Sequence, residues 1–411
     1  MLERSKRSSA PEAPRFLITG SFGFPNGAGA TARVRSYALG LLRGGCRVAV
    51  VPLMVAAPGS VLADTAADGE WRGIRYCYAG GSVVGPAGFL RRRWCEVRGL
   101  QYLLRMIRDA VRSNGLDAVI LYGPELRWIV PLRMICTRYR VLLVHDRSEY
   151  PFVYDPPGGV LRRAYRAWYM SSVFRLFDGV VVISKLLERT LAPRMRCGSW
   201  LLRVPIMVDA DQFTSAEPPT RGLIGYAGNV GHMDEIEDLV LAVASLVDEV
   251  PDVHLLVIGT GSHRQVTELR AMIERHGMTE RVDLKVAVPA DEMPALLCSA
   301  EALALPRRVG LFSEAGMPTK LGEYLATGRP VVVTRTGDIS EYLTDGLDAY
   351  LVEAADVAEF AAALRLALTE SASAAVGVRG REVAFREFDP AAQMRRLIQR
   401  VCAAESGNAH E

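Results

Sequence analysis

Lys320 and Glu323 stand three residues apart near the start of a short predicted helix, where they could bind an anion and a diol. Side chains at this spacing share one helix face. The N-terminus of a helix carries unpaired N–H groups and a partial positive charge, so a phosphate fits beside Lys320. The carboxylate of Glu323, one turn deeper, can accept hydrogen bonds from the hydroxyls of a ribose. A solvated surface pair is the alternative interpretation that the residue types leave open.

The segment around this pair is predicted to form a loop, a helix and a buried strand. Pro318 suits the first helical turn, because its missing N–H costs nothing there. Gly328 is typical of a helix end, and Pro330 prevents the helix from resuming. Residues 331–333 are all valine, which predicts a buried strand.

A second pair that could do chemistry, His145 and Asp146, directly follows a predicted strand at residues 141–144. Ligand sites in open α/β sheets gather beyond the carboxyl ends of the strands. The pair is therefore a candidate for a functional site. A structural, hydrogen-bonding histidine is the alternative.

A glycine-rich loop at residues 20–29 lies between a predicted strand, 15–19, and a predicted helix, 31–43. Such a unit can cradle a phosphate or the polar end of a ligand. Residues 27–32 match the dinucleotide-binding pattern G-x-G-x-x-A, but they do not directly follow the strand. No acidic residue follows the next strand, 47–53, to hold a ribose. Both facts count against a dinucleotide-binding oxidoreductase.

The length of 411 residues favours two domains. Strands, glycine loops and helices alternate in both halves, which predicts an α/β fold of two Rossmann-like, doubly wound parallel-sheet domains. Within the first half, residues 71–78 are predicted to form one strand. We expect a disordered tail, a first domain, a hinge, a second domain and a terminal helix with its tail, at residues 1–14, 15–205, 206–222, 223–385 and 386–411.

The composition argues against several classes of protein. The net charge of +3 is small for this length and argues against a dedicated nucleic-acid binder. No apolar run approaches the length of a transmembrane helix, and residues 1–15 lack the apolar core of a secretory signal. The seven cysteines and six histidines are dispersed, which argues against disulfides and zinc sites. We therefore expect a cytoplasmic protein.

The helix predicted over residues 88–112 is strongly basic, with four of its arginines between Arg91 and Arg98 beside Trp94. Peripheral contact with a membrane surface or an acidic partner is one interpretation of this helix. A solvated helix face is the other.

Residues 316–332 are similar to the pattern P-x-K-x-x-E-Y-x-A-x-G-x-P-V-V of GT-B glycosyltransferases, and specifically of the large family 4 of retaining nucleotide-sugar enzymes. The resemblance covers nearly the whole chain and implies the GT-B fold, with two Rossmann-like domains facing a cleft. The acceptor would lie mainly on the first domain and the donor on the second. Weaker support comes from the first glycine loop with residues 32–34, the His145–Asp146 corner, and residues 182–184, 226–231, 257–261 and 341–346.

The resemblance implies that a sugar moves from a UDP-, GDP- or TDP-sugar to an acceptor hydroxyl, with retained configuration and no required cofactor or metal. The acceptor would be a natural-product precursor or another small molecule, or a lipid-linked saccharide. The implied catalytic residues are His145, Lys320 and Arg307. The implied donor-binding residues are Gly27, Gly29, Gly228, Asn229, Gly259, Val286, Ala287, Glu314, Gly316, Met317, Lys320 and Glu323. The implied acceptor-binding residues are Asn26, Asp146 and Glu149.

One departure from the family concerns an acidic residue that members often carry eight positions before the one matching Glu323. Ala315 stands at that position here. Glu314 is one residue away and is the candidate for the same place beside the sugar. A site without an acidic contact to the sugar is the alternative.

A second departure concerns an Arg and a Lys that many members carry after the first strand of the second domain. Residues 228–234 contain no cation except His232. We therefore expect Lys320, with Arg307 or Arg308, to meet the charge of the diphosphate. Ordinary surface charges are the alternative for the two arginines.

Three rival functions stay open. A GT-B epimerase or phosphorylase would share the fold. A pseudo-glycosyltransferase would bind the nucleotide without transfer, which the two departures favour. An NAD-dependent oxidoreductase is the rival that the sequence disfavours most.

Overall fold

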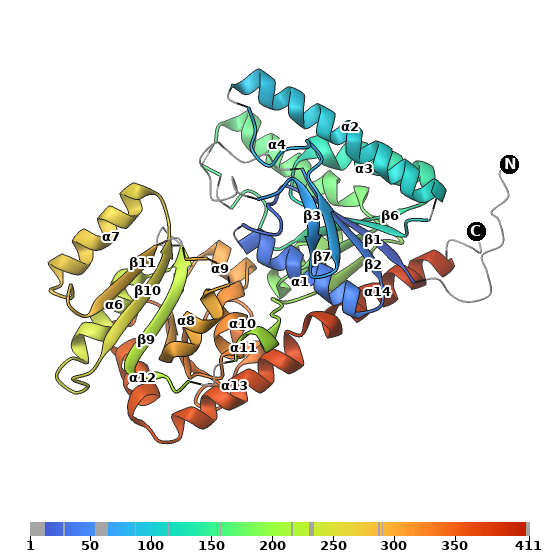
Figure 1. Cartoon of the computed structure of the whole chain (residues 1–411). Coiled ribbons are helices and arrows are strands. Elements are labelled where there is room, and N and C mark those ends of the chain that lie inside the picture. Colours follow the sequence, from blue (N-terminus) through green and yellow to red (C-terminus); the bar gives the residue numbers. More distant parts are fainter. Residues whose placement is uncertain are drawn as a thin grey trace.

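The structure is a computed structural model that describes residues 13–27, 29–53, 65–86, 88–113, 115–153, 155–156, 158–214, 217–229, 234–286, 288–289 and 291–407. The expected disordered tail, residues 1–14, falls outside this set except for its last two residues. Figure 1 shows two α/β domains side by side, joined by the chain between them and by the long C-terminal helix.

In the described residues, the first domain is built on an eight-stranded sheet with the order β3-β4-β2-β1-β5-β6-β7-β8. Its strands are β1 Arg15–Gly20, β2 Arg47–Pro52, β3 Asp68–Trp71, β4 Ile74–Cys77, β5 Ala118–Tyr122, β6 Leu142–Arg147, β7 Gly179–Val182 and β8 Trp200–Arg203. Every neighbouring pair is parallel except β3 and β4. The prediction of one strand at 71–78 is wrong, because Arg72 and Gly73 both take positive φ and turn the chain between β3 and β4.

Both faces of the central strands β5, β6 and β7 are buried, as expected for parallel strands with helices on either side. Successive residues of β1 alternate between two cores: Leu17 belongs to one, and Phe16 and Ile18 belong to the other. The first core packs against α2 Phe89–Ser113, α3 Leu126–Tyr139 and α4 Val160–Ser172. The second packs against α1 Gly29–Arg43 and the C-terminal helix. Short helices complete the domain, namely η1 Val173–Leu176, α5 Lys185–Leu191 and η2 Ala192–Arg194.

The second domain has a six-stranded, all-parallel sheet in the described residues, with the order β11-β10-β9-β12-β13-β14. Its strands are β9 Thr220–Asn229, β10 His254–Thr260, β11 Val282–Val286, β12 Ala300–Leu305, β13 Val331–Thr334 and β14 Tyr350–Val352. Its helices are α6 Ile236–Ser245, α7 His263–Arg275, α8 Met293–Ser299, α9 Leu311–Ala315, α10 Thr319–Ala326, α11 Ile339–Tyr342, α12 Val357–Thr369 and α13 Ser373–Glu387. The predicted pair of doubly wound domains is confirmed.

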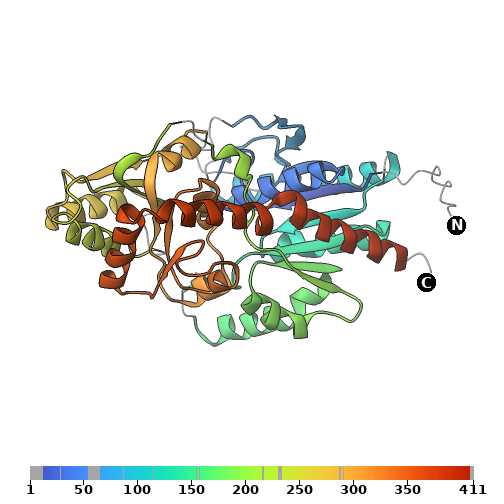
Figure 2. The ribbon, with the colours of Figure 1, turned by 90° about the horizontal axis from the view of Figure 1, so that it is seen from below.

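The last helix, α14 Pro390–Gly407, leaves the second domain and packs on the first (Figures 1 and 2). The Asp389 carboxylate accepts a hydrogen bond from the Ala392 N–H at 2.7 Å, which caps the start of this helix. Met394 and Val401 are fully buried in the core beneath α1. A Cβ added at Gly40 of α1 would lie 2.2 Å from the Pro390 carbonyl, so glycine permits the close approach of the two helices.

Polar contacts also join the domains. The Ser184 hydroxyl donates to the Ala315 carbonyl at 2.6 Å. The Arg203 guanidinium, at the end of β8, pairs with Asp338 at 3.2 Å and with Glu341 at 2.9 Å. The segment between the domains, which includes η3 Ala210–Gln212, is therefore one of several connections between them.

Within the described residues, no single helix is long and apolar enough to cross a membrane. Helix α12 and the following helical stretch Ser373–Ala404, which contains α13 and most of α14, pass that test of length and composition only when they are taken together. The chain bends by 101° between the two parts.

Candidate functional site

The N-terminus of α10 carries the Lys320–Glu323 pair toward the first domain. The Lys320 ammonium donates a hydrogen bond to the Glu323 carboxylate at 3.2 Å, and the two side chains are 29% and 22% exposed. Gly322, between them, approaches Ile206 and Val208 at the domain boundary. The pair is therefore largely shielded, unlike a fully solvated surface pair.

The predicted loop, helix and strand around this pair are confirmed. Helix α10 begins directly after Pro318, whose φ of −71° and ψ of 121° are extended. Gly328 has a φ of +74° just after the helix end, and β13 follows. A Cβ added at Gly316 would lie 2.7 Å from the Phe312 carbonyl, so this loop position needs glycine. Met317 is buried beside it.

Tyr324 fastens α10 to the end of β9. Its hydroxyl accepts a hydrogen bond from the Ala227 N–H at 2.6 Å and donates one to the Ala227 carbonyl at 3.1 Å. The side chain is completely buried, and burial raises the pKa of the phenol, which stays neutral. Sequence reasoning assigned Tyr324 no role, although it stands in the family pattern directly after Glu323.

Replacing Tyr324 with Phe should destabilise the protein by about 1–3 kcal/mol, because two buried backbone groups of Ala227 lose their partner. Urea denaturation of the variant measures this change. Tyr342→Phe is the matched control, since that half-buried hydroxyl makes no hydrogen bond with the described residues. Equal losses in the two variants would contradict the fastening role of Tyr324.

Three predicted donor contacts lie side by side at the carboxyl edge of the second sheet. Gly259 of β10 pairs in register with Gly228 of β9 on one side and with Val286 of β11 on the other. Asn229 follows Gly228 at the end of β9. Ala287 and the segment 230–233, which includes His232, lie outside the described residues.

Arg307, one of the expected diphosphate cations, lies in a buried network. Its guanidinium pairs with Asp234 at 2.9 Å and lies over the Phe312 ring at 5.3 Å. The Tyr226 hydroxyl donates to the same carboxylate at 2.8 Å. Burial raises the pKa of Asp234, and the charge of Arg307 opposes that rise. The Arg307 Nε has no hydrogen-bond partner in the described part of the chain. Contact of Arg307 with a phosphate stays a prediction.

Arg308 and Glu314 lie nearer the surface. Arg308 makes a bidentate ion pair with Glu235, at 2.6 and 2.9 Å. This exposed pair fits the alternative interpretation of Arg308 as an ordinary surface charge. Glu314 is exposed, and its carboxylate accepts a hydrogen bond from the Gly337 N–H at 3.4 Å. Ala315, by contrast, is buried. Contact of Glu314 with a sugar stays a prediction.

The glycine loop of the first domain leads directly into α1. Asn26 and Gly27 are exposed in this loop, and Gly29 opens the helix. Gly27 has a φ of 154°, and a Cβ there would lie 2.1 Å from the Thr31 hydroxyl oxygen. The Thr31 hydroxyl donates to the Gly23 carbonyl at 2.7 Å, so the compact loop requires glycine at position 27.

Helix α1 also brings an arginine, Arg35, to the domain boundary. Its guanidinium lies over the Trp71 ring at 4.7 Å. Burial and then the charge of Arg72 lower the pKa of Arg35, while nearby Glu323 raises it. A first-domain cation therefore lies near enough to Glu323 for the two charges to attract each other, and sequence reasoning did not find it.

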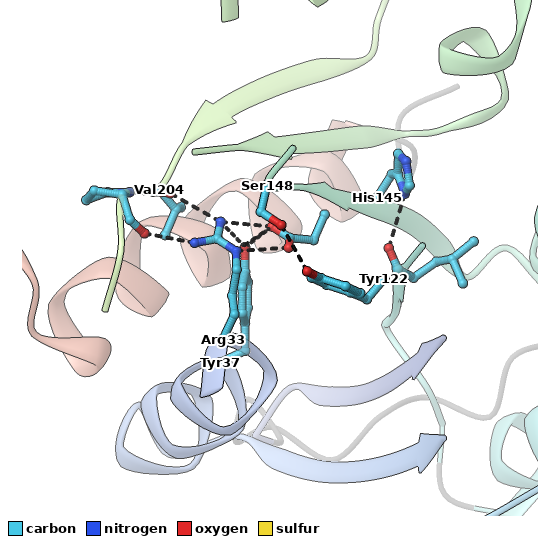
Figure 3. A network of polar contacts seen from close by, with 9 residues as sticks. Arg33, Tyr37, Tyr122, His145, Ser148 and Val204 are labelled. Carbon is cyan, nitrogen blue, oxygen red and sulfur yellow. Dashed lines mark hydrogen bonds and ion pairs between the residues drawn. The ribbon is translucent and has the colours of Figure 1, made fainter. Parts of the chain in front are cut away.

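Asp146 is held by a buried ion pair rather than left free. Its carboxylate accepts hydrogen bonds from Arg33 Nε and Nη2, both at 2.9 Å, and from the Tyr37 hydroxyl at 2.6 Å. Arg33 also donates to the carbonyls of Val204 and Pro205, where the chain leaves the first domain (Figure 3). The network thus fixes α1 and the start of the hinge to β6. Contact of Asp146 with an acceptor stays a prediction.

His145 points to the other face of β6 and is completely buried. Its ring stacks on Phe177 with centroids 4.4 Å apart, and Nδ1 lies 3.1 Å from the Leu121 carbonyl. Nε2 has no partner. In Figure 3 the ring lies apart from Arg33 and Tyr37. This placement fits the structural alternative, and contact with the transferred sugar stays a prediction.

Burial, helped by the charge of Arg147, lowers the pKa of His145 from 6.5 to about 4. The folded protein therefore holds a neutral ring that the unfolded chain protonates near pH 6.5. The stability from this site is complete above that pH and is lost as the pH falls toward 4. Between pH 7 and pH 4.5 the loss should be about 2–3 kcal/mol.

Denaturation of the native chain and of His145→Leu at the two pH values measures this effect. Other groups titrate equally in both proteins, so the difference between them isolates the histidine. A variant that loses as much stability as the native chain would contradict the placement of a neutral His145 in the core.

A cavity of about 190 Å³ opens at the carboxyl ends of β5 and β6. Two predicted acceptor residues, Asp146 and Glu149, line it, and Asn26 does not. Burial raises the pKa of Glu149, and the charge of Arg147 opposes the rise. The remaining lining residues are Tyr122, Gly123, Pro124, Arg147, Ser148, Tyr150, Phe152, Val153 and Asp155. No group of three or more His, Cys, Asp or Glu in the described ranges is placed to hold a metal ion.

Two Rossmann-like domains, a returning C-terminal helix and a helix N-terminus with a lysine and a carboxylate define the GT-B class of glycosyltransferase folds. Residues 221–370 match the family model described as "Glycosyl transferases group 1". The resemblance to GT-B glycosyltransferases is thereby confirmed.

Two curated relatives are similar to this chain over part of their length. A 2-deoxystreptamine glucosyltransferase of Streptomyces kanamyceticus is 26% identical over 68% of this chain and 72% of its own. A GDP-mannose-dependent alpha-(1-6)-phosphatidylinositol monomannoside mannosyltransferase of Mycolicibacterium smegmatis is 28% identical over 51% of this chain and 58% of its own.

Solved structures share the whole fold at low sequence identity. Sucrose-phosphate synthase of Thermosynechococcus elongatus superimposes with a TM-score of 0.69 and 17% identity, over 95% of this chain and all of the other. HepE of Anabaena, solved with UDP-glucose, superimposes with a TM-score of 0.69 and 15% sequence identity, over 95% of this chain and 99% of the HepE chain.

Proposed function

We propose that this protein is a retaining glycosyltransferase of family 4 that moves a sugar from a nucleotide diphosphate sugar to an acceptor hydroxyl. The observation that carries the proposal is the shielded Lys320–Glu323 pair at the N-terminus of α10. Lys320 and the first N–H groups of the helix would bind the diphosphate, and Glu323 would bind the ribose hydroxyls. The edge formed by Gly228, Gly259 and Val286 would lie beside the nucleotide.

The barrier lies in breaking the bond between C1 of the sugar and the phosphate oxygen. The leaving diphosphate gathers negative charge in the transition state, and each well-placed donor commonly contributes about 3 kcal/mol to its stabilisation. Lys320 and the α10 N-terminus would supply such donors, with Arg307 as a further candidate. In the front-side mechanism the leaving phosphate oxygen takes the acceptor proton, so the reaction needs no hydrolase-type carboxylate pair. Lys320 and the α10 N-terminus would neutralise the diphosphate charge in place of a metal ion.

The first domain would bind the acceptor in the cavity at the ends of β5 and β6. Closure of the two domains would exclude water and limit hydrolysis of the donor. The relatives are named as a 2-deoxystreptamine glucosyltransferase and a phosphatidylinositol monomannoside mannosyltransferase, so a small-molecule acceptor and a lipid-linked acceptor both stay candidates.

A peripheral membrane location would suit a lipid-linked acceptor. Helix α2 exposes Leu90 and Trp94 among its arginines, and α4 exposes Leu161 and Trp168. Exposed apolar side chains beside basic ones favour the interfacial region of an anionic membrane. A protein that acts in the cytoplasm on a soluble acceptor is the other candidate.

A nucleotide-binding protein without transfer, either a pseudo-glycosyltransferase or an epimerase, is the second candidate function. Two observations favour it. Ala315 is buried and apolar where the family often has an acid, and Arg307 is already paired with Asp234.

A thermal-shift panel of UDP, GDP, TDP and ADP tests the proposal. A ligand at 100 times its Kd should add about 2.7 kcal/mol of stability. We expect one of the four to raise the midpoint, after which transfer from the matching nucleotide sugar is assayed. A protein that binds none of the four would contradict both candidate functions, and binding without transfer would favour the second.

A further inference from the structure

The cavity of the first domain contains a buried cation that the proposed mechanism does not use. Arg147 is only 8% exposed, and it lines this cavity. Among the residues that the structure describes, its Nε has no hydrogen-bond partner. An arginine stays charged at every physiological pH, and a buried charge without a partner is unfavourable.

The carboxylates of the cavity do not neutralise Arg147 in the described residues. Asp146 is bound by Arg33 on the opposite face of β6. Asp155 pairs with Arg166 at 3.3 Å. Glu149 is close enough for its pKa to respond to Arg147, but it forms no ion pair with it within 4.0 Å.

Neutral hydrogen-bonding groups stand in the same wall. The Tyr122 and Ser148 hydroxyls lie 3.0 Å apart, and Figure 3 shows them facing each other at the ends of β5 and β6. A guanidinium and hydroxyl donors are the groups that proteins use to bind phosphate and carboxylate.

We propose that this cavity binds an anionic group, phosphate or carboxylate, carried by the acceptor, and that Arg147 is its main contact. The inference rests on the proposed function, because it names the chemical class of that enzyme's acceptor. An acceptor held by its anionic group would present a hydroxyl toward the donor site on α10.

Calorimetry with inorganic phosphate tests this site apart from the donor site. The protein is first saturated with the nucleoside diphosphate that the thermal-shift panel selects, so the donor phosphate positions are filled. We expect phosphate to bind the native chain, and Arg147→Gln to weaken that binding roughly 10- to 100-fold. Arg147→Lys keeps the positive charge and should lose less phosphate affinity than Arg147→Gln.

Controls separate this inference from the proposed function. Arg264→Gln removes an exposed arginine on α7 and should leave phosphate binding unchanged. Unchanged nucleotide affinity in Arg147→Gln shows that the variant is folded. Nucleotide binding together with phosphate binding that is absent or independent of Arg147 would overturn this inference and leave the proposed function standing. Failure to bind any nucleotide would instead overturn the proposed function.

Two further probes identify the source of the anion. Glucose 6-phosphate represents a soluble acceptor, and phosphatidylcholine vesicles with and without phosphatidylinositol represent a lipid headgroup. Binding of either probe that falls in Arg147→Gln supports the proposal and names the source. Binding of neither probe by the native chain would contradict an anionic acceptor.

Discussion

Replacing Lys320 with Ala should weaken binding of a nucleoside diphosphate roughly 10- to 100-fold, because a charge-assisted contact to the diphosphate is lost. No arginine or lysine stands at residues 228–231, so we expect Lys320 to meet a large share of the diphosphate charge. Glu323→Ala should also weaken nucleotide binding, because the contact with the ribose hydroxyls is lost. The same variant should weaken binding of the nucleoside, which has the ribose but no phosphate. Calorimetry with the nucleotide, and with the matching nucleoside, measures both effects.

The exposed pair Arg264 and Glu268 of α7 is the matched control. It is also an ion pair on one helix face, at 2.7 Å, but its side chains are 86% and 59% exposed. Arg264→Ala and Glu268→Ala should leave nucleotide affinity unchanged. If Lys320→Ala and Glu323→Ala behave like these controls, the pair on α10 is an ordinary surface pair and the donor site lies elsewhere.

Replacing Asp146 with Asn should destabilise the protein by about 3–5 kcal/mol, because it leaves the buried Arg33 charge without its counter-ion. The two side chains are 1% and 3% exposed, so water cannot compensate for the loss. Arg33→Met should cost a similar amount. The double variant Arg33→Met with Asp146→Leu should recover much of the stability, since apolar replacement of a whole buried pair is often close to neutral.

Urea denaturation of the native chain, Arg33→Met, Asp146→Leu and the double variant gives the coupling energy between the two residues. Asp146 is also a predicted acceptor residue, and the two roles give different results. A loss below about 1 kcal/mol for Asp146→Asn, with additive changes in the double variant, would be typical of an exposed pair and would contradict the structural role.

The candidate donor segment was predictable because its signals are local. Pro318, Gly328 and Pro330 mark the helix ends, and the spacing of Lys320 and Glu323 puts them on one face. The observed α10 begins and ends where these residues indicate. Likewise, Gly228 and Gly259 stand at the carboxyl ends of two predicted strands, which a parallel sheet must align at one edge.

The faces of β6 could not be predicted in the same way. The strand is buried on both sides, so its sequence has no alternation of apolar and polar residues to show which side chain faces which layer. His145 and Asp146 are neighbours in sequence but point into different layers. The sequence therefore presented the two residues as one candidate pair, although their side chains lie in two separate environments.

Contacts between residues far apart in the sequence could not be predicted from local sequence patterns. The Arg33 and Asp146 side chains meet across 113 positions of sequence. Tyr324 meets Ala227 across 97. The turn at Arg72 and Gly73 was missed for a different reason, because an arginine with positive φ is uncommon and the flanking residues suit a strand.

A crystal structure of the chain with the nucleoside diphosphate that the thermal-shift panel selects would test the central claim most directly. We expect the diphosphate oxygens to lie against the first N–H groups of α10 and the Lys320 ammonium, with the ribose hydroxyls on the Glu323 carboxylate. A nucleotide bound away from α10, for example only at the glycine loop of residues 20–29, would contradict it.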